Sequence, residues 1–339
     1  MNILITSAGR RSYLVKYFKK CLKNKGEVHV SNSVDNVPSF FEADKFVVSP
    51  YCFEDTYVPF ILNYCVSNNI TAVISVYDVD VGVLSKYKEL FKEHGITLVM
   101  PDSNFVEICN DKWKTFLFLK DNHFYTPLTY LGIDNVKNAL KSGEISFPVV
   151  VKPRFGNGSI GVNIAENQEE LTVFYEKTKR SILNSWLSFE SSSEKEIVIF
   201  QQFIKGDEYG VDIINDLKGS FVTSIVKKKH GMRSGETDAA TIIENDKIFQ
   251  ETKKIALLSN HIANLDCDGF LLDDNFYILE MNPRFGGGYP FSHTAGVDLP
   301  KAIIYWLTNK KVNKSILTAK PNCFAYKDLV IRLGKNNEK

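Results

Sequence analysis

The stretch FYILEMNPRFGGGY, residues 276–289, is the most informative part of this chain. It opens with an apolar, β-prone run that follows the polar segment 273–275, which predicts a buried strand. Glu280 and Asn282 are two residues apart, so their side chains point to the same face of an extended backbone. Two oxygen ligands on one face suit Mg²⁺, a hard cation that completes its octahedral shell with water and phosphate. The strand is therefore predicted to end in a magnesium site.

Two further features of this stretch favour an anion beside the metal. Arg284 lies on the same face as Asn282 if the strand continues past Pro283, and a guanidinium can neutralise phosphate through paired hydrogen bonds. The glycines at 286–288 let backbone N–H groups approach an anion closely. A strand end followed by an ordinary charged loop is the alternative, but the complete pattern ExNPRFGGG favours a phosphate site.

A second segment, FPVVVKPRFGNGSIGV at 147–162, has the features of a phosphate-binding hairpin. A β-branched run at 148–151 leads directly into Lys152, and a lysine that ends a buried strand needs an anion or a carboxylate at its tip. The glycine-rich turn at 156–161 precedes a second strand. This order differs from the Walker A loop, in which the lysine follows the glycines and a helix comes next. An ordinary β-hairpin turn is the alternative.

Together these segments resemble the ATP-grasp superfamily, most closely the branch similar to the large chain of carbamoyl-phosphate synthase and its single-unit relatives. The resemblance extends from Ile3 to about Leu307. It implies an α/β fold with an N-terminal Rossmann-like (pre-ATP-grasp) domain over residues 1–100. A two-subdomain α+β ATP-grasp fold would follow over 101–339, with a lid subdomain at about 124–200.

The resemblance also implies a role for each candidate site residue. The residues expected to bind ATP are Lys112, Lys152, Gly156, Gly158, Ser159 and Gly161 around the phosphates, Gln201, Gln202, Phe203 and Ile204 at the adenine hinge, and Glu208 on the ribose. The expected metal ligands are Asp268, Glu280 and Asn282, with Asp266 as the alternative to Asp268. The residues expected to act on the transferring phosphoryl group or acyl phosphate are Arg284, Lys152 and Arg233. The family usually has an acidic hinge residue; here a glutamine amide oxygen would accept from adenine N6 instead.

The first hundred residues alternate between strands and helices, which predicts βαβ units and a parallel sheet. The expected strands are 3–6, 27–31, 72–76 and 97–99, and the expected helices are 11–22, 54–68 and 79–94. The loops at 7–11 and 77–80 follow strands, at the edge where such sheets bind ligands. Arg10 or Arg11 could therefore pair with an anionic group of a substrate, and Asp78 or Asp80 with an ammonium or with sugar hydroxyls. Capping or surface roles remain the alternative for each.

Three other segments carry expectations that depend on local composition. The serine-rich stretch at 188–195 predicts a surface loop, and the lysines at 227–229 predict a solvated basic turn. A long helix is expected at 246–264, and Asp212 is assigned no role. His230 and His293 lie within motif segments, so contact with substrate stays open for both.

Composition narrows the classes of partner. The net charge of +1 gives no field that would attract a polyanion, so nucleic acid is not expected. The chain has no apolar run near the roughly 18 residues of a membrane span and no basic segment of a signal peptide at its start. The six cysteines are scattered without a CxxC pair, which favours free thiols in the cytoplasm.

The resemblance implies an ATP-dependent carboxylate–amine ligase that uses Mg²⁺, with Mn²⁺ as an alternative. Its substrates would be a small polar carboxylic acid, such as an amino acid or a sugar acid, and an amine. Phosphoryl transfer would give an acyl phosphate, and the amine would displace phosphate. Two other functions stay open: a phosphotransferase whose product is carbamoyl phosphate or another acyl phosphate, and a nucleotide-binding protein without catalysis. A homodimer is also left open.

Overall fold

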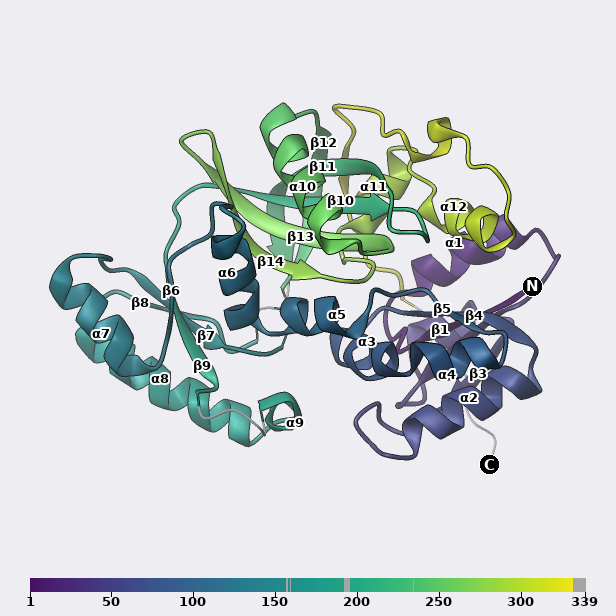
Figure 1. Cartoon of the computed structure of the whole chain (residues 1–339), viewed down its shortest axis with the longest axis horizontal. Coiled ribbons are helices and arrows are strands. Elements are labelled where there is room, and N and C mark those ends of the chain that lie inside the picture. Colours follow the sequence, from purple (N-terminus) through teal and green to yellow (C-terminus); the bar gives the residue numbers. More distant parts are fainter. Residues whose placement is uncertain (157, 159, 192–195, 234, 332–339) are drawn as a thin grey trace.

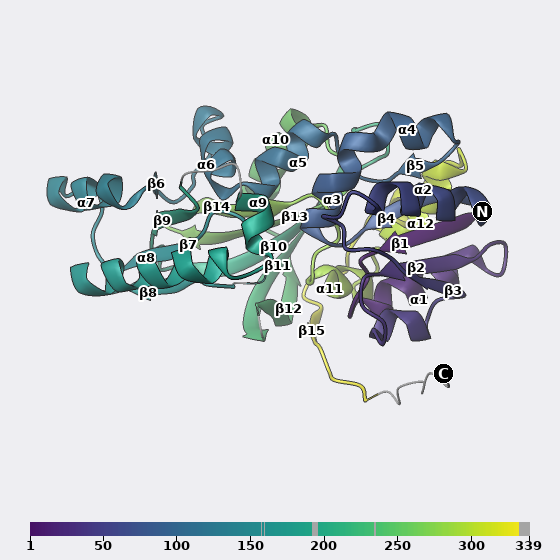
Figure 2. The ribbon, with the colours of Figure 1, turned by 90° about the horizontal axis from the view of Figure 1, so that it is seen from below.

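The computed structural model describes residues 1–331 apart from 157, 159, 192–195 and 234. Within these residues the strands form three sheets. Figures 1 and 2 show the segment at about 124–200, which we call the lid, at one end of the molecule, the N-terminal domain at the other, and a long antiparallel sheet between them. No helix of the described part is long and apolar enough to cross a membrane. The predicted α/β organisation, a parallel N-terminal sheet followed by antiparallel sheets, is confirmed.

The N-terminal domain is a parallel sheet between two helical layers. Its strands, in spatial order, are β3 (Lys45–Val48), β2 (Val28–Asn32), β1 (Asn2–Thr6), β4 (Ile70–Ser75) and β5 (Thr97–Leu98). Its main helices are α1 (Ser12–Leu22), α2 (Tyr57–Ser67), α3 (Asp78–Leu84) and α4 (Lys88–Glu93). The central strand is buried on both faces, because Ile3 and Ile5 pack in one core and Leu4 packs in the other.

Two details of this domain differ from the sequence-based expectation. Strand β3 was not predicted, because it is an edge strand whose residues are mostly exposed and show no buried pattern. The expected helix at 79–94 is interrupted by a 3₁₀ turn at Ser85–Tyr87, which separates α3 from α4.

The lid is a small antiparallel sheet covered by two helices. Its strands, in spatial order, are β6 (Thr129–Leu131), β9 (Val198–Gln202), β7 (Val149–Pro153) and β8 (Asn163–Ala165). The covering helices are α7 (Ile133–Ser142) and α8 (Gln168–Leu183). The expected surface loop at 188–195 is wrong in its described part, because Leu187–Ser191 form the helix α9 with Leu187 and Ser191 buried.

The third sheet carries Glu208 and the predicted metal ligands. Its strands, in spatial order, are β14 (Asn275–Asn282), β13 (Ala263–Leu272), β10 (Asp207–Asn215), β11 (Phe221–Arg233), β12 (Glu236–Ile243) and β15 (Phe324–Tyr326). The helices α5 (Ser103–Asn110), α6 (Lys112–Asp121) and α10 (Asp246–Ser259) contribute to its core, and α11 (Tyr289–Thr294) and α12 (Leu299–Leu307) pack towards α1. Helix α10 ends earlier than expected, because Asn260 takes a left-handed backbone conformation with φ 46°.

The lysines at 227–229 correct another expectation. They lie inside β11 rather than in a solvated turn. Because side chains alternate along a strand, Lys227 and Lys229 face the interior and are nearly fully buried, whereas Lys228 stays partly exposed. Carboxylates on β10 compensate both buried ammonium groups: Lys227 donates to Asp212, and Lys229 donates to Glu208 at 2.8 Å.

Candidate active site

Two cavities meet on the third sheet. One, of about 230 Å³, lies between this sheet and the lid, and we call it the lid cavity. The other, of about 280 Å³, lies between the sheet and the loops after β1 and β4, and we call it the N-terminal cavity. Both are lined by Gly158, Met232, Gly235, Asp268 and Glu280. The two predicted carboxylate ligands, Asp268 and Glu280, therefore lie at the junction of the two cavities.

The lid cavity gathers most of the residues predicted to bind a nucleotide. They are Lys112, Lys152, Gly156, Gly158, Gln201, Gln202, Phe203, Ile204 and Glu208. Gly161 is not among the lining residues, and Ser159 lies outside the described residues. Apolar side chains from the lid and from the sheet form the walls, among them Val150, Ile164 and Leu279. Apolar walls with a cationic end suit a flat base carrying phosphates.

Lys152 is the buried cation of this cavity. Its side chain donates to Gln201 Oε1 at 2.8 Å, and burial lowers its pKa to about 8, with Glu280 opposing and Lys112 adding to that shift. The Gln201 amide nitrogen donates to Thr129 Oγ1 at 2.9 Å. Both ends of this amide are therefore engaged in holding Lys152, so it orients the lysine rather than presenting a free oxygen to adenine.

Lys112 follows Asp111, which forms an ion pair with Arg154 of the lid. Sequence reasoning did not predict this pair. Arg154 donates to both carboxylate oxygens of Asp111, at 2.8 and 2.6 Å, and both side chains are buried. Asp111 also caps the start of α6, where the Lys112 backbone N–H donates to Arg154 O at 3.1 Å. The Lys112 ammonium donates to Gly156 O. The sequence contains both partners, Asp111 in the motif DK and Arg154 in the motif KPRFG. It gives no sign that these residues, 43 positions apart, form a pair.

The predicted metal ligands lie on adjacent strands. Asp268 is paired directly with Glu280 across β13 and β14, and Asp266 is paired with Asn282. Burial raises the pKa of Asp268; Lys229, which donates to it at 2.8 Å, opposes that shift, and Glu280 adds to it. Two carboxylates thus face each other, and Lys229 joins only one of them, Asp268, to Glu208, so a divalent cation would stabilise this site.

The predicted metal ligands supply part of the coordination shell that Mg²⁺ needs. Among the described residues, no three His, Cys, Asp or Glu side chains lie close enough to hold a metal ion by themselves. Asp268, Glu280 and Asn282 offer two carboxylates and one amide, so phosphate and water would complete the shell. These oxygen donors fit Mg²⁺.

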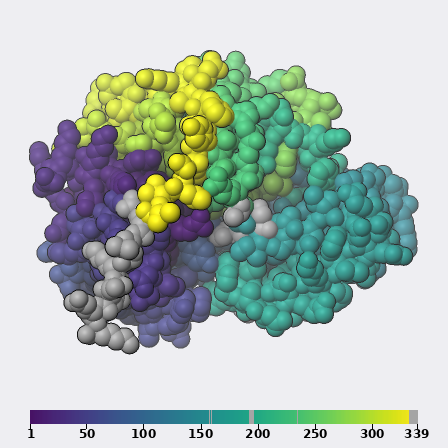
Figure 3. Space-filling view, turned by 180° about the vertical axis from the view of Figure 1, so that it is seen from behind, coloured from purple at the N-terminus to yellow at the C-terminus, as the bar shows by residue number. Residues whose placement is uncertain are grey.

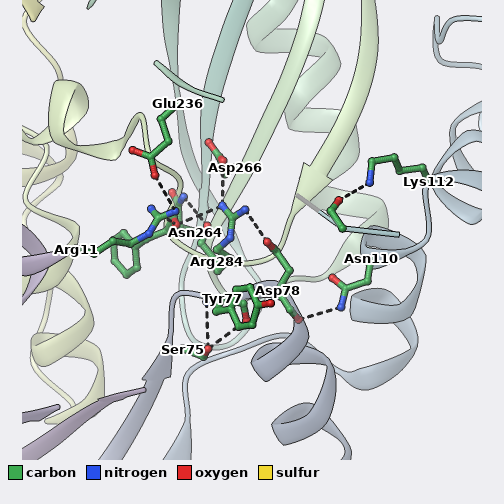
Figure 4. A network of polar contacts seen from close by, with 12 residues as sticks. Arg11, Ser75, Tyr77, Asp78, Asn110, Lys112, Glu236, Asn264, Asp266 and Arg284 are labelled. Atoms are coloured by element: carbon green, nitrogen blue, oxygen red, sulfur yellow. Dashed lines mark hydrogen bonds and ion pairs between the residues drawn. The ribbon is translucent and has the colours of Figure 1, made fainter. Parts of the chain in front are cut away.

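Arg284 lines the N-terminal cavity, and Figure 4 shows its guanidinium between Asp78 and Asp266. It donates to Asp78 of the N-terminal domain at 2.9 Å and to Asp266 at 3.2 Å. Burial alone would lower its pKa, but the two carboxylates outweigh it and raise the pKa. Its Nε is buried and has no hydrogen-bond partner within the described residues. The guanidinium is therefore held in place while one of its N–H groups still needs an acceptor.

The N-terminal loops contribute unequally. Asp80 is fully buried and accepts from Tyr57, Ser75 and Ser7 at 2.7, 2.8 and 2.9 Å, so it supports the loop rather than the cavity. The residues of these loops that line the cavity include Arg10, Arg11, Tyr77 and Asp78. The Arg11 guanidinium donates to Phe285 O at 3.2 Å and lies 3.8 Å from Glu236 on β12.

Arg233, like Gly161, lines neither cavity. It is half exposed at the end of β11 and donates to Asp238 at 2.8 Å. Its neighbour Gly235 instead lies against the glycine-rich turn: with φ +76°, a Cβ there would come within 2.2 Å of Gly158 O. The hairpin between β11 and β12 thus packs on that turn through a residue that must be glycine.

The two histidines for which contact with substrate was left open have other partners. His230 lies 2.7 Å from Thr241 Oγ1, and His293 is stacked on Tyr17 with ring centroids 3.6 Å apart. Neither lines the lid cavity or the N-terminal cavity.

Comparison with known families agrees with this geometry. Residues 109–288 match the ATP-grasp domain, and residues 3–99 match the N-terminal domain of PylC-like proteins. The first of these matches covers more than half of the chain.

Curated relatives include large chains of carbamoyl phosphate synthase. The protein of that name from Clostridium botulinum (strain Alaska E43 / Type E3) is 24% identical over 295 residues, which is 84% of this chain and 26% of the relative. The one from Helicobacter pylori (strain J99) is 28% identical over 206 residues, or 58% of this chain and 18% of the relative. The chain thus spans about a quarter or less of the length of these proteins.

Solved structures share the fold at low identity. The biotin carboxylase domain of Hydrogenobacter thermophilus 2-oxoglutarate carboxylase, a dimer in complex with MgADP, ADP and bicarbonate, has a TM-score of 0.72 at 17% identity over 92% of this chain and 70% of that one. The N5-carboxyaminoimidazole synthetase of Staphylococcus aureus, complexed with ADP, has a TM-score of 0.70 at 14% identity over 96% and 79%.

Proposed function

Since the chain belongs to the ATP-grasp family, we propose that it is an ATP-dependent ligase that joins a carboxylate to an amine through an acyl phosphate. The observation that carries this proposal is the meeting of the two cavities at Asp268 and Glu280. One cavity has the walls and cations for ATP. The other is polar and is lined by loops of the N-terminal domain, as a separate substrate site requires.

In the first step a carboxylate oxygen attacks the γ-phosphorus of ATP, and ADP leaves. Little covalent chemistry is asked of the protein, so its contribution is positioning and charge neutralisation. Lys112 and Lys152 would hold the phosphates from the lid side, and Arg284 would face the acyl phosphate from the N-terminal cavity. In the second step the amine attacks the acyl carbon, phosphate leaves, and one proton is lost from nitrogen.

Mg²⁺ would be held by Glu280, Asn282 and Asp268, and when bound it supplies charge that compensates the phosphates. The two facing carboxylates support this assignment, since their mutual repulsion would be relieved by a divalent cation. Mn²⁺ prefers the same oxygen donors and is proposed as a substitute.

The substrates are proposed to be small and polar, an amino acid or a sugar acid together with an amine. The volume of the N-terminal cavity, about 280 Å³, and its mixture of cationic and anionic side chains support this class. We also propose a domain boundary near residue 100, a lid at about 124–200, a cytoplasmic location and a homodimer. The six free cysteines fit a reducing compartment.

The experiment that tests the function is release of ADP and phosphate, measured across panels of carboxylic acids and amines. A ligase should release both only when an acid and an amine are present together, and mass spectrometry should find the amide. Release with the acid alone, with an acyl phosphate that hydroxylamine traps, would favour the acyl-phosphate product that the named relatives suggest. No turnover with any pair, despite tight nucleotide binding, would favour the non-catalytic alternative.

A further inference from the structure

The segment from Trp186 to Ser191 touches the lid, the N-terminal domain and the site. Trp186 packs against the hydrophobic core of the lid and also against the core beneath α2 and α3 of the N-terminal domain. Helix α9 follows it directly, at Leu187–Ser191. Figure 3 shows the lid (teal) as a lobe of its own beside the N-terminal domain (purple to blue).

Two aromatic pairs join the lobes. The Trp186 ring lies 5.9 Å from that of Tyr77 in an edge-on arrangement, and Phe189 lies 5.5 Å from Phe53. Pairs of this kind add a modest stabilisation beyond the burial of the rings. The contact is therefore strong enough to favour one placement of the lid and weak enough to be reversible.

The same segment reaches the phosphate end of the lid cavity. Leu187 occupies the space beside Gly156, where an added Cβ would come within 2.5 Å of Leu187 Cδ2. Gly156 O in turn accepts from Lys112. Glu190 lines a small cavity that Asp78, Lys112 and Glu280 also line, and its Oε2 is buried without a hydrogen-bond partner in the described part of the chain.

On its other side the segment touches the N-terminal cavity. Tyr77 lines that cavity and does not line the lid cavity. The next residue, Asp78, holds Arg284 at 2.9 Å. A continuous line of contacts thus runs from Arg284 through Asp78 and Tyr77 to Trp186, and from there to Gly156.

We propose that Trp186 is a positioning residue, which sets Gly156 at the start of the glycine-rich turn for nucleotide by docking on Tyr77 and so couples the two cavities. This inference rests on the proposed function in taking the ligand of the lid cavity to be ATP. A change at Tyr77, outside the lid cavity, should therefore alter nucleotide affinity. Couplings between sites of one protein are commonly about 5- to 150-fold.

The test is a double-mutant cycle on nucleotide binding in the absence of other substrates. The dissociation constant of the Mg²⁺ complex of β,γ-imido-ATP would be measured by calorimetry for the full chain and for Tyr77→Leu, Trp186→Phe and the double variant. We expect each single substitution to weaken binding by about fivefold or more, and the double variant to be no weaker than the worse single one. Tyr87→Leu, at an exposed tyrosine of the same domain, is the matched control and should bind like the parent.

Circular dichroism and thermal unfolding would show that each variant is folded. Parental affinity in folded Tyr77→Leu, or losses that simply add in the double variant, would overturn the coupling and leave the ligase proposal untouched. Absence of binding by the parent protein would overturn both.

Discussion

Arg284 and Asp78 are 206 residues apart in sequence and joined by a hydrogen bond of 2.9 Å in the fold. One comes from the segment after β14 and the other from the start of α3, so the pair links the ATP-grasp domain to the N-terminal domain. Because both side chains are nearly buried, each compensates the charge of the other. The arginine that faces the proposed acyl phosphate is thus oriented by the domain that is proposed to bind the acceptor.

Asp78→Asn keeps the shape of the side chain and removes its charge. We expect the KM of one acceptor substrate to rise about tenfold or more, because Arg284 loses a charged partner, while the KM for ATP changes less than about threefold. Steady-state kinetics with each substrate varied in turn would measure both. Asp80→Asn is the control: it should lower stability instead, since Asp80 accepts three hydrogen bonds away from the cavity. An equal loss of ATP affinity in Asp78→Asn would contradict the division between the domains.

Glu280→Ala should reduce turnover by about 10²-fold or more while the fold stays intact, because the phosphate charge loses its compensation. Asn282→Ala should be damaging as well, and Asp268→Ala is expected to have a smaller effect. The measurement is turnover as a function of Mg²⁺ concentration, with Asp274→Ala, at an exposed carboxylate, as the control. Substantial Mg²⁺-dependent turnover by Glu280→Ala would remove this residue from the site.

Lys152→Met should separate stability from binding. The substitution removes a buried ammonium whose pKa burial lowers to about 8, so we expect unfolding stability to be unchanged or higher. Affinity for ATP should fall by about 10- to 100-fold, because the phosphates lose a charged donor. Chemical denaturation and calorimetry would measure the two quantities, with Lys228→Met on the exposed side of β11 as control. A variant that loses stability but keeps its affinity would mark Lys152 as structural.

His261 should make stability depend on pH. Its Nε2 lies 3.1 Å from Ile213 O and must carry the proton, while Nδ1 accepts from Ser259 Oγ at 2.8 Å, so the folded protein holds the neutral ring. Burial lowers its pKa from 6.5 to about 4. The unfolded chain therefore binds the proton first, and stability should fall by up to about 3 kcal/mol as the pH drops from 6.5 to 4.

Urea unfolding across that window would measure the effect of His261. His261→Gln should flatten the pH dependence by about one bound proton. Parallel pH profiles for the parent and His261→Gln would contradict the assignment.

The sequence predicted the elements whose signals are local. The strand ending in Glu280 and Asn282 was found because apolar residues and the spacing of two ligands occur in one stretch. The prediction for the lysines of β11 was wrong for the opposite reason. Lys227 and Lys229 are buried because Asp212 and Glu208 face them from β10, and a run of charged residues does not reveal the strand register that brings these side chains together.

Long-range partners explain the other differences. The serine-rich stretch is polar, which is typical of a loop. Its start nevertheless packs against the N-terminal domain, because Phe189 contacts Phe53 and the preceding Trp186 contacts Tyr77. The Asp111–Arg154 pair likewise depends on a contact between the start of α6 and the end of β7. Such pairs are set by tertiary packing, which a single sequence does not reveal.

The two cavities share Asp268 and Glu280, but only the N-terminal one is walled by the loops after β1 and β4. If the N-terminal cavity binds the acceptor, as proposed, substitutions in those loops change which acceptor is used and leave the proposed ATP site intact. A chimera carrying residues 1–100 of a relative is then expected to use that relative's acceptor while it keeps this chain's proposed ATP site.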